Sequence, residues 1–212
     1  MFKKKTVNFR LKMVKEIKKT KRDNITEEAA TLFKERGFAA TTMRDIAGKV
    51  GMEAASLYNH VKSKDDILQE ICFRFANEYL SALDKISQKV GSSAKKIEAI
   101  IDLHVTLSTE DAAAIIITNY EWKHLPEPHF TDFKIMRKSY EKKILDIITE
   151  GVKDGSLKNI DPQVVMFTIL SALRWIPFWY REERGVSPID LKRNIKTLIL
   201  KGLQSDWAIG RI

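Results

Sequence analysis

Residues 41–68 read TTMRDIAGKVGMEAASLYNHVKSKDDIL, and this stretch decides the fold. Thr42 and Asp45 have the spacing of a capping box, in which a hydroxyl and a carboxylate each satisfy a backbone N–H at a helix start. The spacing therefore predicts that a short helix begins directly after Thr42. Gly51 is expected to end that helix, because glycine adopts the left-handed conformation of a sharp turn without strain.

A second short helix is expected over residues 54–61, where Leu57 and Val61 supply the packing face. Ser63 and Asp66 then form another capping box, which begins a third helix. Two short helices joined at a steep angle by a glycine-containing turn form a helix-turn-helix, whose second helix can enter the major groove of DNA. An ordinary helical hairpin inside a bundle gives the same pattern, so the pattern alone leaves this alternative open.

The order of residues resembles the DNA-binding domain of TetR-family transcriptional regulators. Many spaced positions carry the resemblance: Ile25, Ala29, Leu32, Phe33, Gly37, Phe38, Thr41, Thr42, Ile46, Ala47, Val50, Gly51, Leu57, Tyr58, His60 and residues 63–68. It implies contacts between double-stranded DNA phosphates and three side chains, those of Thr42, Tyr58 and Lys64. It also implies a second set of residues near the base edges: Arg44, Ala55, Ser56, Asn59 and His60.

The residues expected near the base edges include Arg44 and Asn59, whose side chains suit this role, because an arginine can pair with guanine and an asparagine with adenine. The sequence departs from the family pattern at Glu53, where a Ser or Thr usually caps the recognition helix. A carboxylate at this position favours the N-terminus of a helix but lies unfavourably close to phosphates. The departure leaves the exact entry of the helix open.

Residues 20–66 are the expected head domain, with three helices. Thr20 and Asp23 form the capping box of its first helix, and Gly37 ends that helix. The expected core contains Ile25, Leu32, Phe33, Phe38, Ile46, Val50, Leu57 and Val61. A core of this size is marginal alone, so the head is expected to dock onto the rest of the chain.

The excess positive charge of the chain lies at its beginning. The net charge is +9, and residues 1–22 alone hold ten Lys/Arg against one acid. A basic arm, residues 1–19, therefore precedes the helix-turn-helix, where it can neutralise phosphates. A solvated tail and, more weakly, a helix on a membrane surface are the alternatives.

The single cysteine, Cys72, excludes a disulfide framework within one chain and suits a reducing cytoplasm. Its apolar neighbours predict a buried thiol. The apolar runs are too short to span a bilayer, and the basic start lacks the apolar segment of a secretory signal. A cytoplasmic protein without a membrane partner is the expectation.

Beyond residue 64 the periodicity stays helical and predicts an all-α chain. Residues 67–212 are the expected body, a six-helix domain for ligand binding and dimerisation, and 44% hydrophobic residues suffice for its core. The predicted helices cover residues 64–90, 94–108, 110–124, 131–154, 161–180 and 187–202.

The helix expected over residues 161–180 has almost no polar face, so it should be buried on all sides. In a short chain, one side can face its own core while the other faces a second subunit. The resemblance also implies such a homodimer, with recognition helices roughly 34–36 Å apart on a pseudo-palindromic site. The expected interface residues are Phe167, Phe178, Leu191, Ile195, Leu198 and Ile199. A monomer that buries both helices internally is the alternative.

Aromatic and sulfur-containing side chains gather along the predicted body helices and are candidates for an apolar effector cavity. They are His104, Tyr120, Trp122, Phe133, Met136, Tyr140, Trp175 and Trp179. Close packing in the core or the dimer interface explains each of them equally well. Pro177 is expected to kink its helix or end it early. The pattern from Asp161 to Pro188 resembles TetR-type regulators that respond to fatty-acid or acyl-CoA ligands.

These observations predict a transcriptional repressor that a small hydrophobic, acyl-CoA-type effector releases from DNA. A ligand-independent, DNA-bound adaptor whose body holds a protein partner is the alternative. An enzyme is not expected, because the sequence lacks a glycine-rich phosphate loop, metal-ligand spacing and a nucleophile pattern around its histidines. No catalytic residue, metal or cofactor is predicted.

Overall fold

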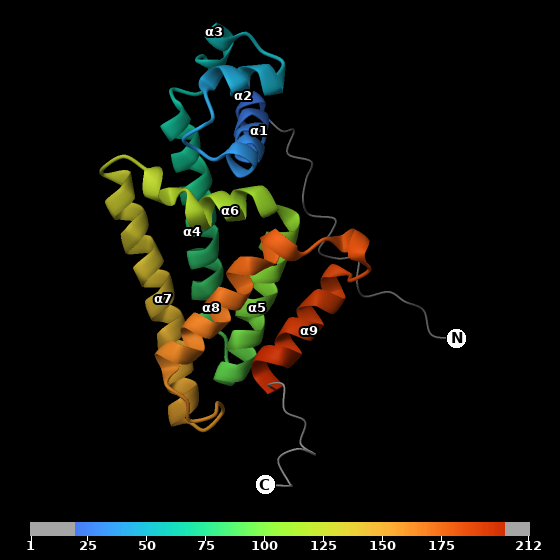
Figure 1. Ribbon diagram of the computed structural model, residues 1–212. Coiled ribbons are helices and arrows are strands. Elements are labelled where there is room, and N and C mark those ends of the chain that lie inside the picture. Colours follow the sequence, from blue (N-terminus) through green and yellow to red (C-terminus); the bar gives the residue numbers. More distant parts are fainter. Residues whose placement is uncertain (1–19, 202–212) are drawn as a thin grey trace.

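The computed structural model describes residues 20–201, and these are all-helical without a β-strand. Figure 1 shows an elongated molecule, with the three helices of the head at one end and the body below them. The described residues form these elements: α1 (Lys21–Arg36), α2 (Met43–Val50), α3 (Ala54–Leu57), α4 (Lys64–Ser87), α5 (Ser93–Glu110), α6 (Ala112–Tyr120), the 3₁₀ helix η1 (Trp122–His124), α7 (His129–Lys153), α8 (Pro162–Trp179), the 3₁₀ helix η2 (Glu182–Arg184) and α9 (Pro188–Lys201).

The helix starts of the head are as predicted. Thr20 caps α1 and Thr42 caps α2, each in a capping box in which both hydrogen bonds are present. Gly51 ends α2 with φ 69° and ψ 36°, the left-handed conformation that its position required. The predicted core is buried, except that Val50 is only partly buried against it.

One prediction about the head is corrected. The second helix was expected over residues 54–61, but α3 contains only Ala54–Leu57. The chain continues in tighter turns, in which Asn59 N–H donates to the Ser56 carbonyl at 3.2 Å and His60 N–H to the Leu57 carbonyl at 2.9 Å. Glu53 makes no side-chain capping bond, so the side chains do not hold the start of this helix.

α4 connects the head with the body. Its 24 residues span about 36 Å at 1.5 Å per residue, and it ends at Ser87, three residues before the predicted end. Arg22 on α1 fixes its upper end, because its guanidinium donates to Glu70 at 2.6 Å, to Asp66 at 3.2 Å and to the His60 carbonyl at 2.6 Å. The first turns of α1 and α4 therefore move together.

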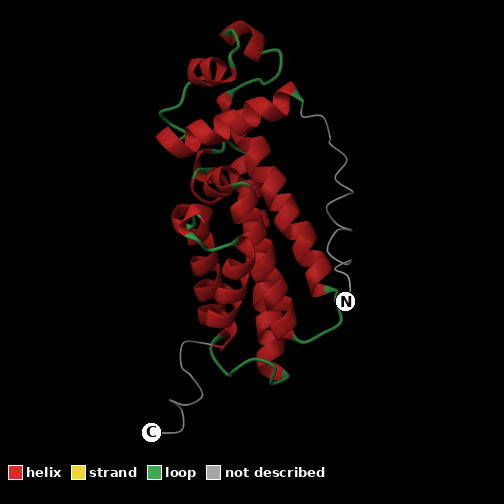
Figure 2. Ribbon diagram, turned by 90° about the vertical axis from the view of Figure 1, so that its right-hand side faces the viewer, coloured by secondary structure: helices red, strands yellow, loops and turns green. Residues whose placement is uncertain are grey.

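The body packs around the lower part of α4. α7, α6 and α5 contact α4, α8 packs against α7 and α5, and α9 packs against α5. α6 crosses beneath the head and contacts α1 (Figure 1). Figure 2 shows from the side how the long helices run away from the head. The other body helices begin and end close to the predicted residues.

The buried residues form two clusters. One cluster joins head residues such as Ile25 and Leu57 to body residues such as Ile115 and Phe133, and the other fills the lower body between α5, α7 and α8. The head is thus docked on the body through a shared core, as its small size required. Cys72 is fully buried, and burial raises the pKa of its thiol to about 12.

Residues 1–19, the basic arm, and 202–212 lie outside the described residues. Within residues 20–201, no helix has both the length and the apolar character that a membrane span needs. The same residues hold no group of three or more side chains that could bind a metal ion.

Candidate functional site

The end of the head carries most of the residues expected at DNA. Thr42, Arg44, Ala55, Ser56, Tyr58 and Asn59 are exposed, and His60 is half-buried. Tyr58 keeps 54% of its surface exposed and is therefore accessible to a partner. The structure therefore brings these residues together on the free surface of α2 and α3.

Lys64 differs from the other expected phosphate contacts, because its ammonium already donates hydrogen bonds to backbone carbonyls of its own chain. It donates to the Phe38 carbonyl at 2.7 Å and the Thr41 carbonyl at 2.9 Å. The same group lies 4.3 Å from the centroid of the Phe38 ring. Lys64 holds the connection between α1 and α2, and a phosphate would have to compete with these carbonyls for it.

A cavity lies in the body beside α4, between α5, α6, α7 and α8. Its volume is about 60 Å³, far below the roughly 300 Å³ of a typical ligand site, so it is too small for a typical ligand in this state of the protein. Four of the eight predicted effector residues line it: His104, Phe133, Met136 and Tyr140. The sequence analysis missed the other lining residues: Ala76, Tyr79, Leu80, Thr118, Asn119, Arg137, Glu141, Leu170 and Arg174.

Three of the missed residues are charged. Arg174 on α8 donates to Glu141 on α7 at 3.2 Å, while Arg137 lies one turn before Glu141 on α7. Burial and the neighbouring Arg174 lower the pKa of Arg137. In the sequence Arg137 and Glu141 fall on the polar side of an amphipathic pattern, so nothing in that pattern distinguishes them from a solvated face. Arg174 is the one charged residue of the apolar helix α8, and this isolation is the signal that could have identified it.

The uncharged polar part of the cavity is a small aromatic cluster. His104 Nε2 and the Tyr140 hydroxyl share a hydrogen bond of 2.8 Å, and the rings of Tyr79 and His104 lie 4.7 Å apart. Burial lowers the pKa of His104 to about 3, so its ring is neutral at neutral pH. Burial also raises the pKa of Tyr140. This cluster can donate and accept hydrogen bonds without carrying charge.

The other four predicted effector residues do not line the cavity. Tyr120, Trp175 and Trp179 lie on the surface of the body and are 41%, 58% and 48% exposed. Trp122 stacks on Phe130 with 5.3 Å between ring centroids, beside the cavity and not in its wall. Aromatic content alone did not distinguish the inner from the outer face of α8.

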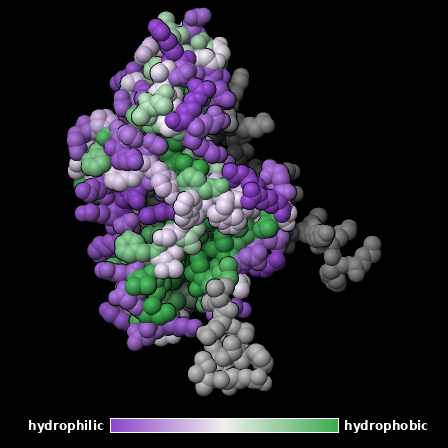
Figure 3. All heavy atoms as spheres, in the orientation of Figure 1, coloured by the Kyte–Doolittle hydropathy of each residue, from purple (hydrophilic) through white to green (hydrophobic). Residues whose placement is uncertain are grey.

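α8 leaves an apolar strip uncovered. Figure 3 shows hydrophobic surface gathered over α8 and its border with α9. Its large exposed side chains are Val164, Phe167, Trp175, Phe178 and Trp179, and Leu198 of α9 is 50% exposed. A groove of about 490 Å³ runs between the two helices. Leu191 was expected in the interface, but it is 2% exposed and packs in the core of its own chain. Ile195 and Ile199 are partly buried against that core.

A second connection joins the cavity wall to the head, besides α4. The Arg137 guanidinium lies 5.0 Å from the Trp122 ring at the start of η1. At the end of η1, the His124 ring stacks on Phe38 of the head with 5.4 Å between centroids. Phe38 is also the residue whose carbonyl accepts from Lys64. A displacement of η1 would therefore reach the α1–α2 connection directly.

Comparisons with known proteins match both regions of the chain. Residues 25–71 match the family described as "Bacterial regulatory proteins, tetR family", and residues 90–203 match the "Tetracyclin repressor-like, C-terminal domain". The HTH-type transcriptional repressor KstR2 of Rhodococcus jostii is 30% identical over 190 residues, which cover 89% of this chain and 93% of that protein.

More distant relatives match over most of the length of the chain. The fatty acid metabolism regulator protein of Bacillus subtilis is 20% identical over 190 residues, covering 89% of this chain and 98% of that protein. The structure of AibR in complex with isovaleryl coenzyme A and operator DNA covers 84% of this chain and 97% of its own, with a TM-score of 0.74 and 21% identity, and shows the same fold. The chain belongs to the TetR family of bacterial regulatory proteins, and it is a DNA-binding transcriptional regulator and not an enzyme.

Proposed function

We propose that this cytoplasmic protein is a ligand-responsive repressor, which binds a pseudo-palindromic operator as a homodimer and leaves it when a small apolar, acyl-type effector enters the body. The observation that carries the proposal is the place of the cavity. α4 contributes to its wall, Arg137 in the wall contacts η1, and α4 and η1 are the two elements that also hold the head. The relatives AibR, solved with isovaleryl coenzyme A, and the fatty acid metabolism regulator support an acyl-type effector.

The mechanism follows from the size of the cavity. An effector with an acyl chain needs several times the present volume of about 60 Å³, so it binds only a body in which α7, α8 or η1 has moved away from α4. A ligand that binds the open body better shifts the population toward it. Because α4 and η1 both contact the head, the shift changes the distance between the two heads of a dimer and prevents them from occupying both half-sites.

The electrostatics of DNA binding depend on the basic arm. Residues 20–66 contain eight Lys/Arg and eight Asp/Glu, so the described head has no net charge. Residues 1–19 hold eight Lys/Arg against one acid and supply the attraction to phosphates. We assign Thr42 and Tyr58 to phosphates and Arg44, Ala55, Ser56, Asn59 and His60 to the base edges. Operator affinity should therefore fall steeply with salt.

The homodimer is supported by the uncovered apolar strip of α8. A contiguous hydrophobic surface of this kind marks an interaction site on a water-soluble domain. We assign Phe167, Phe178 and Leu198 to its centre, with Ile195 and Ile199 at its edge. Two copies related by a two-fold axis bury the strip and place both heads on one side of the molecule.

The test is an operator-release experiment. Duplexes selected from a random library at low salt are titrated by fluorescence anisotropy, and the mass of the complex is measured by analytical ultracentrifugation. We expect two protomers per duplex, and loss of binding when acyl thioesters are added. A protein that binds duplex with two protomers but responds to no acyl thioester, acid or alcohol would favour the adaptor, and a protein that ignores every duplex would end the proposal.

A further inference from the structure

The cavity contains more positive than negative charge. Its charged lining residues are Arg137, Arg174 and Glu141. The single carboxylate is bound to Arg174, with 3.2 Å between Nη2 and Oε1. Among residues 20–201, no ion pair joins Arg137 to a carboxylate. Two guanidinium groups therefore share one carboxylate, and Arg137, which feels the charge of Glu141 only at longer range, has no ion pair of its own within these residues.

An unpaired guanidinium in this position is costly, because the protein interior solvates a charge poorly. Arg137 is mostly withdrawn from water and contacts the face of Trp122 at 5.0 Å, an interaction that fixes its direction but does not neutralise it. A nearby second cation, Arg174, increases the cost. Such a cation is expected where a ligand brings the missing negative charge.

A second polar group in the same cavity also lacks a partner. The hydroxyl of Thr118 on α6 is buried, and Thr118 Oγ1 has no hydrogen-bond partner within the described part of the chain. Buried hydroxyls are almost always hydrogen-bonded, so an unpaired one in a cavity wall points to a group that is bound there. Two other polar lining residues, His104 and Tyr140, already bond each other and lack no partner.

We propose that the effector of this regulator carries an anionic oxygen group, which pairs with the guanidinium of Arg137 and accepts a hydrogen bond from Thr118. Its apolar part lies against Phe133, Met136 and Leu170, which line the same cavity. This inference rests on the proposed function, because it names the chemistry of the effector. The anionic group belongs either to a free carboxylic acid or to the phosphates of a coenzyme A thioester.

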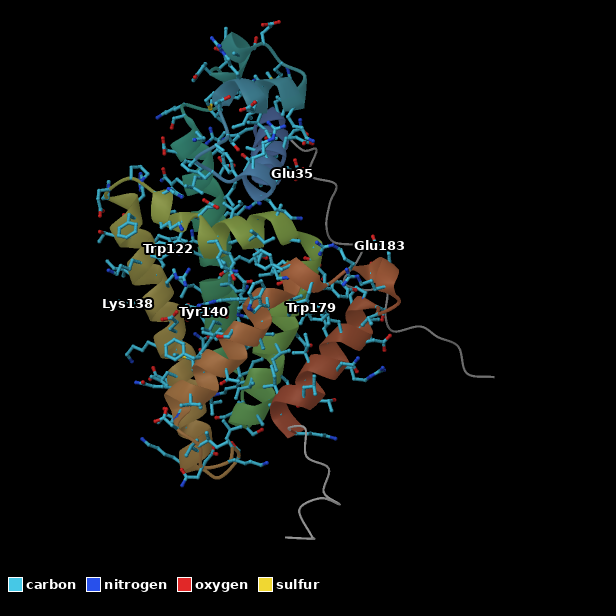
Figure 4. The ribbon with its side chains drawn as sticks, in the orientation of Figure 1. Glu35, Trp122, Lys138, Tyr140, Trp179 and Glu183 are labelled. Atoms are coloured by element: carbon cyan, nitrogen blue, oxygen red, sulfur yellow. The ribbon has the colours of Figure 1, made fainter. Side chains whose placement is uncertain are left out.

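The experiment compares probes that share an apolar part and differ in their head group, which is either anionic or neutral. Decanoate, 4-phenylbutanoate and 3-cyclohexylpropanoate are each tested beside the corresponding primary alcohol and coenzyme A thioester, by calorimetric titration and by melting temperature. Arg137→Gln removes the guanidinium. Lys138→Gln is the matched control, because it removes one positive charge from the exposed, outer side of the same helix, as Figure 4 shows.

We expect an acid or thioester to bind wild-type protein more tightly than its alcohol, and Arg137→Gln to weaken that binding at least tenfold. Lys138→Gln should leave it unchanged. If the free acid binds, its carboxylate is the group that pairs with Arg137. If only the thioester binds, and its binding depends on Arg137, the phosphates of coenzyme A are that group. Equal binding of charged and neutral probes, or charged probes that bind Arg137→Gln as well as wild type, overturns the proposal.

The ligand-free protein gives an independent result, which applies even if no probe binds. Without an anion, Arg137→Gln should melt at the wild-type temperature or above it, because it removes a mostly buried charge that has no ion pair within the described residues and lies near a second cation. A melting temperature lower by more than roughly 4 °C would show that the guanidinium is structural and overturn the proposal. Operator release is measured separately. If only neutral probes release the operator, the anion site is refuted and the ligand-responsive repressor is not. If charged probes bind but do not release the operator, the ligand-responsive repressor is refuted and the anion site is not.

Discussion

Replacing Lys64 by methionine separates two roles that this side chain can have. If its ammonium holds the α1–α2 connection, Lys64→Met removes two short charged hydrogen bonds, to the Phe38 and Thr41 carbonyls at 2.7 and 2.9 Å, and a longer one to the Ala39 carbonyl at 3.4 Å. Each such bond contributes about 1.5–3 kcal/mol when buried. Lys64 is half exposed, so water replaces part of this, and we expect a loss of about 2–3 kcal/mol.

The loss is measured by urea unfolding, followed by circular dichroism at equal protomer concentrations, because the proposed dimerisation would make the free energy of unfolding depend on concentration. It corresponds to a melting temperature lower by roughly 4–12 °C for a chain of this size. Lys62→Met is the control, since Lys62 is exposed and carries the same charge in the same loop. It should leave the free energy of unfolding within about 0.5 kcal/mol of wild type.

The refuting result comes from DNA binding measured against salt. A lysine that only contacts a phosphate contributes roughly 0.9 to the slope of log affinity against log salt and nothing to stability. If Lys64→Met lowers this slope by about that amount and leaves unfolding unchanged, the hydrogen bonds to Phe38 and Thr41 are dispensable. The structural role assigned to Lys64 would then be wrong.

Three further predictions follow from burial. Gly151→Ala would place a Cβ 2.6 Å from Leu157 Cδ1 and should lower the free energy of unfolding, measured in urea, by about 1–3 kcal/mol. Gly48→Ala is the control, because its Cβ meets open space in a helix, and it should raise the free energy of unfolding by up to about 1 kcal/mol. Because the folded pKa of His104 is lowered to about 3, the unfolded chain binds the extra proton between that pH and about 6.5. Acidification should therefore destabilise wild type relative to His104→Gln by up to about 1.4 kcal/mol per pH unit, and parallel pH profiles would contradict this. Cys72, with a thiol pKa of about 12, should react with a disulfide reagent only at the rate of unfolding, and rapid labelling of native protein would count against its burial.

The sequence predicted the elements well, because local chemistry determines them. The capping boxes at Thr20 and Thr42 and the left-handed Gly51 depend on neighbouring residues only, and the structure confirms all three. The helix over α3 was predicted with its observed start, and only its end was wrong, because the tight turns after Leu57 satisfy the backbone without a regular helix.

The cavity was harder to predict, because tertiary packing assembles it. Arg137 and Arg174 lie on different helices, and only the crossing of α7 and α8 brings both to one space. Periodicity assigns charged residues to solvent by default. Trp175 and Trp179 show the opposite error, because they were expected to line the cavity and are exposed. Their helix is apolar on nearly every side, so its pattern does not show which side faces the core. The sequence alone does not show which helices touch, so it cannot show that these two arginines lie in one cavity.

The stack of Phe38 on His124 has a consequence for protein engineering. Regulators of this architecture invite the exchange of operator specificity by grafting one head onto another body. Here the graft boundary would cut a shared core and leave His124 facing a foreign residue in place of Phe38. A chimera that transfers η1 together with residues 20–63 should keep its inducibility, whereas one that transfers the head alone should bind DNA without responding to the inducer.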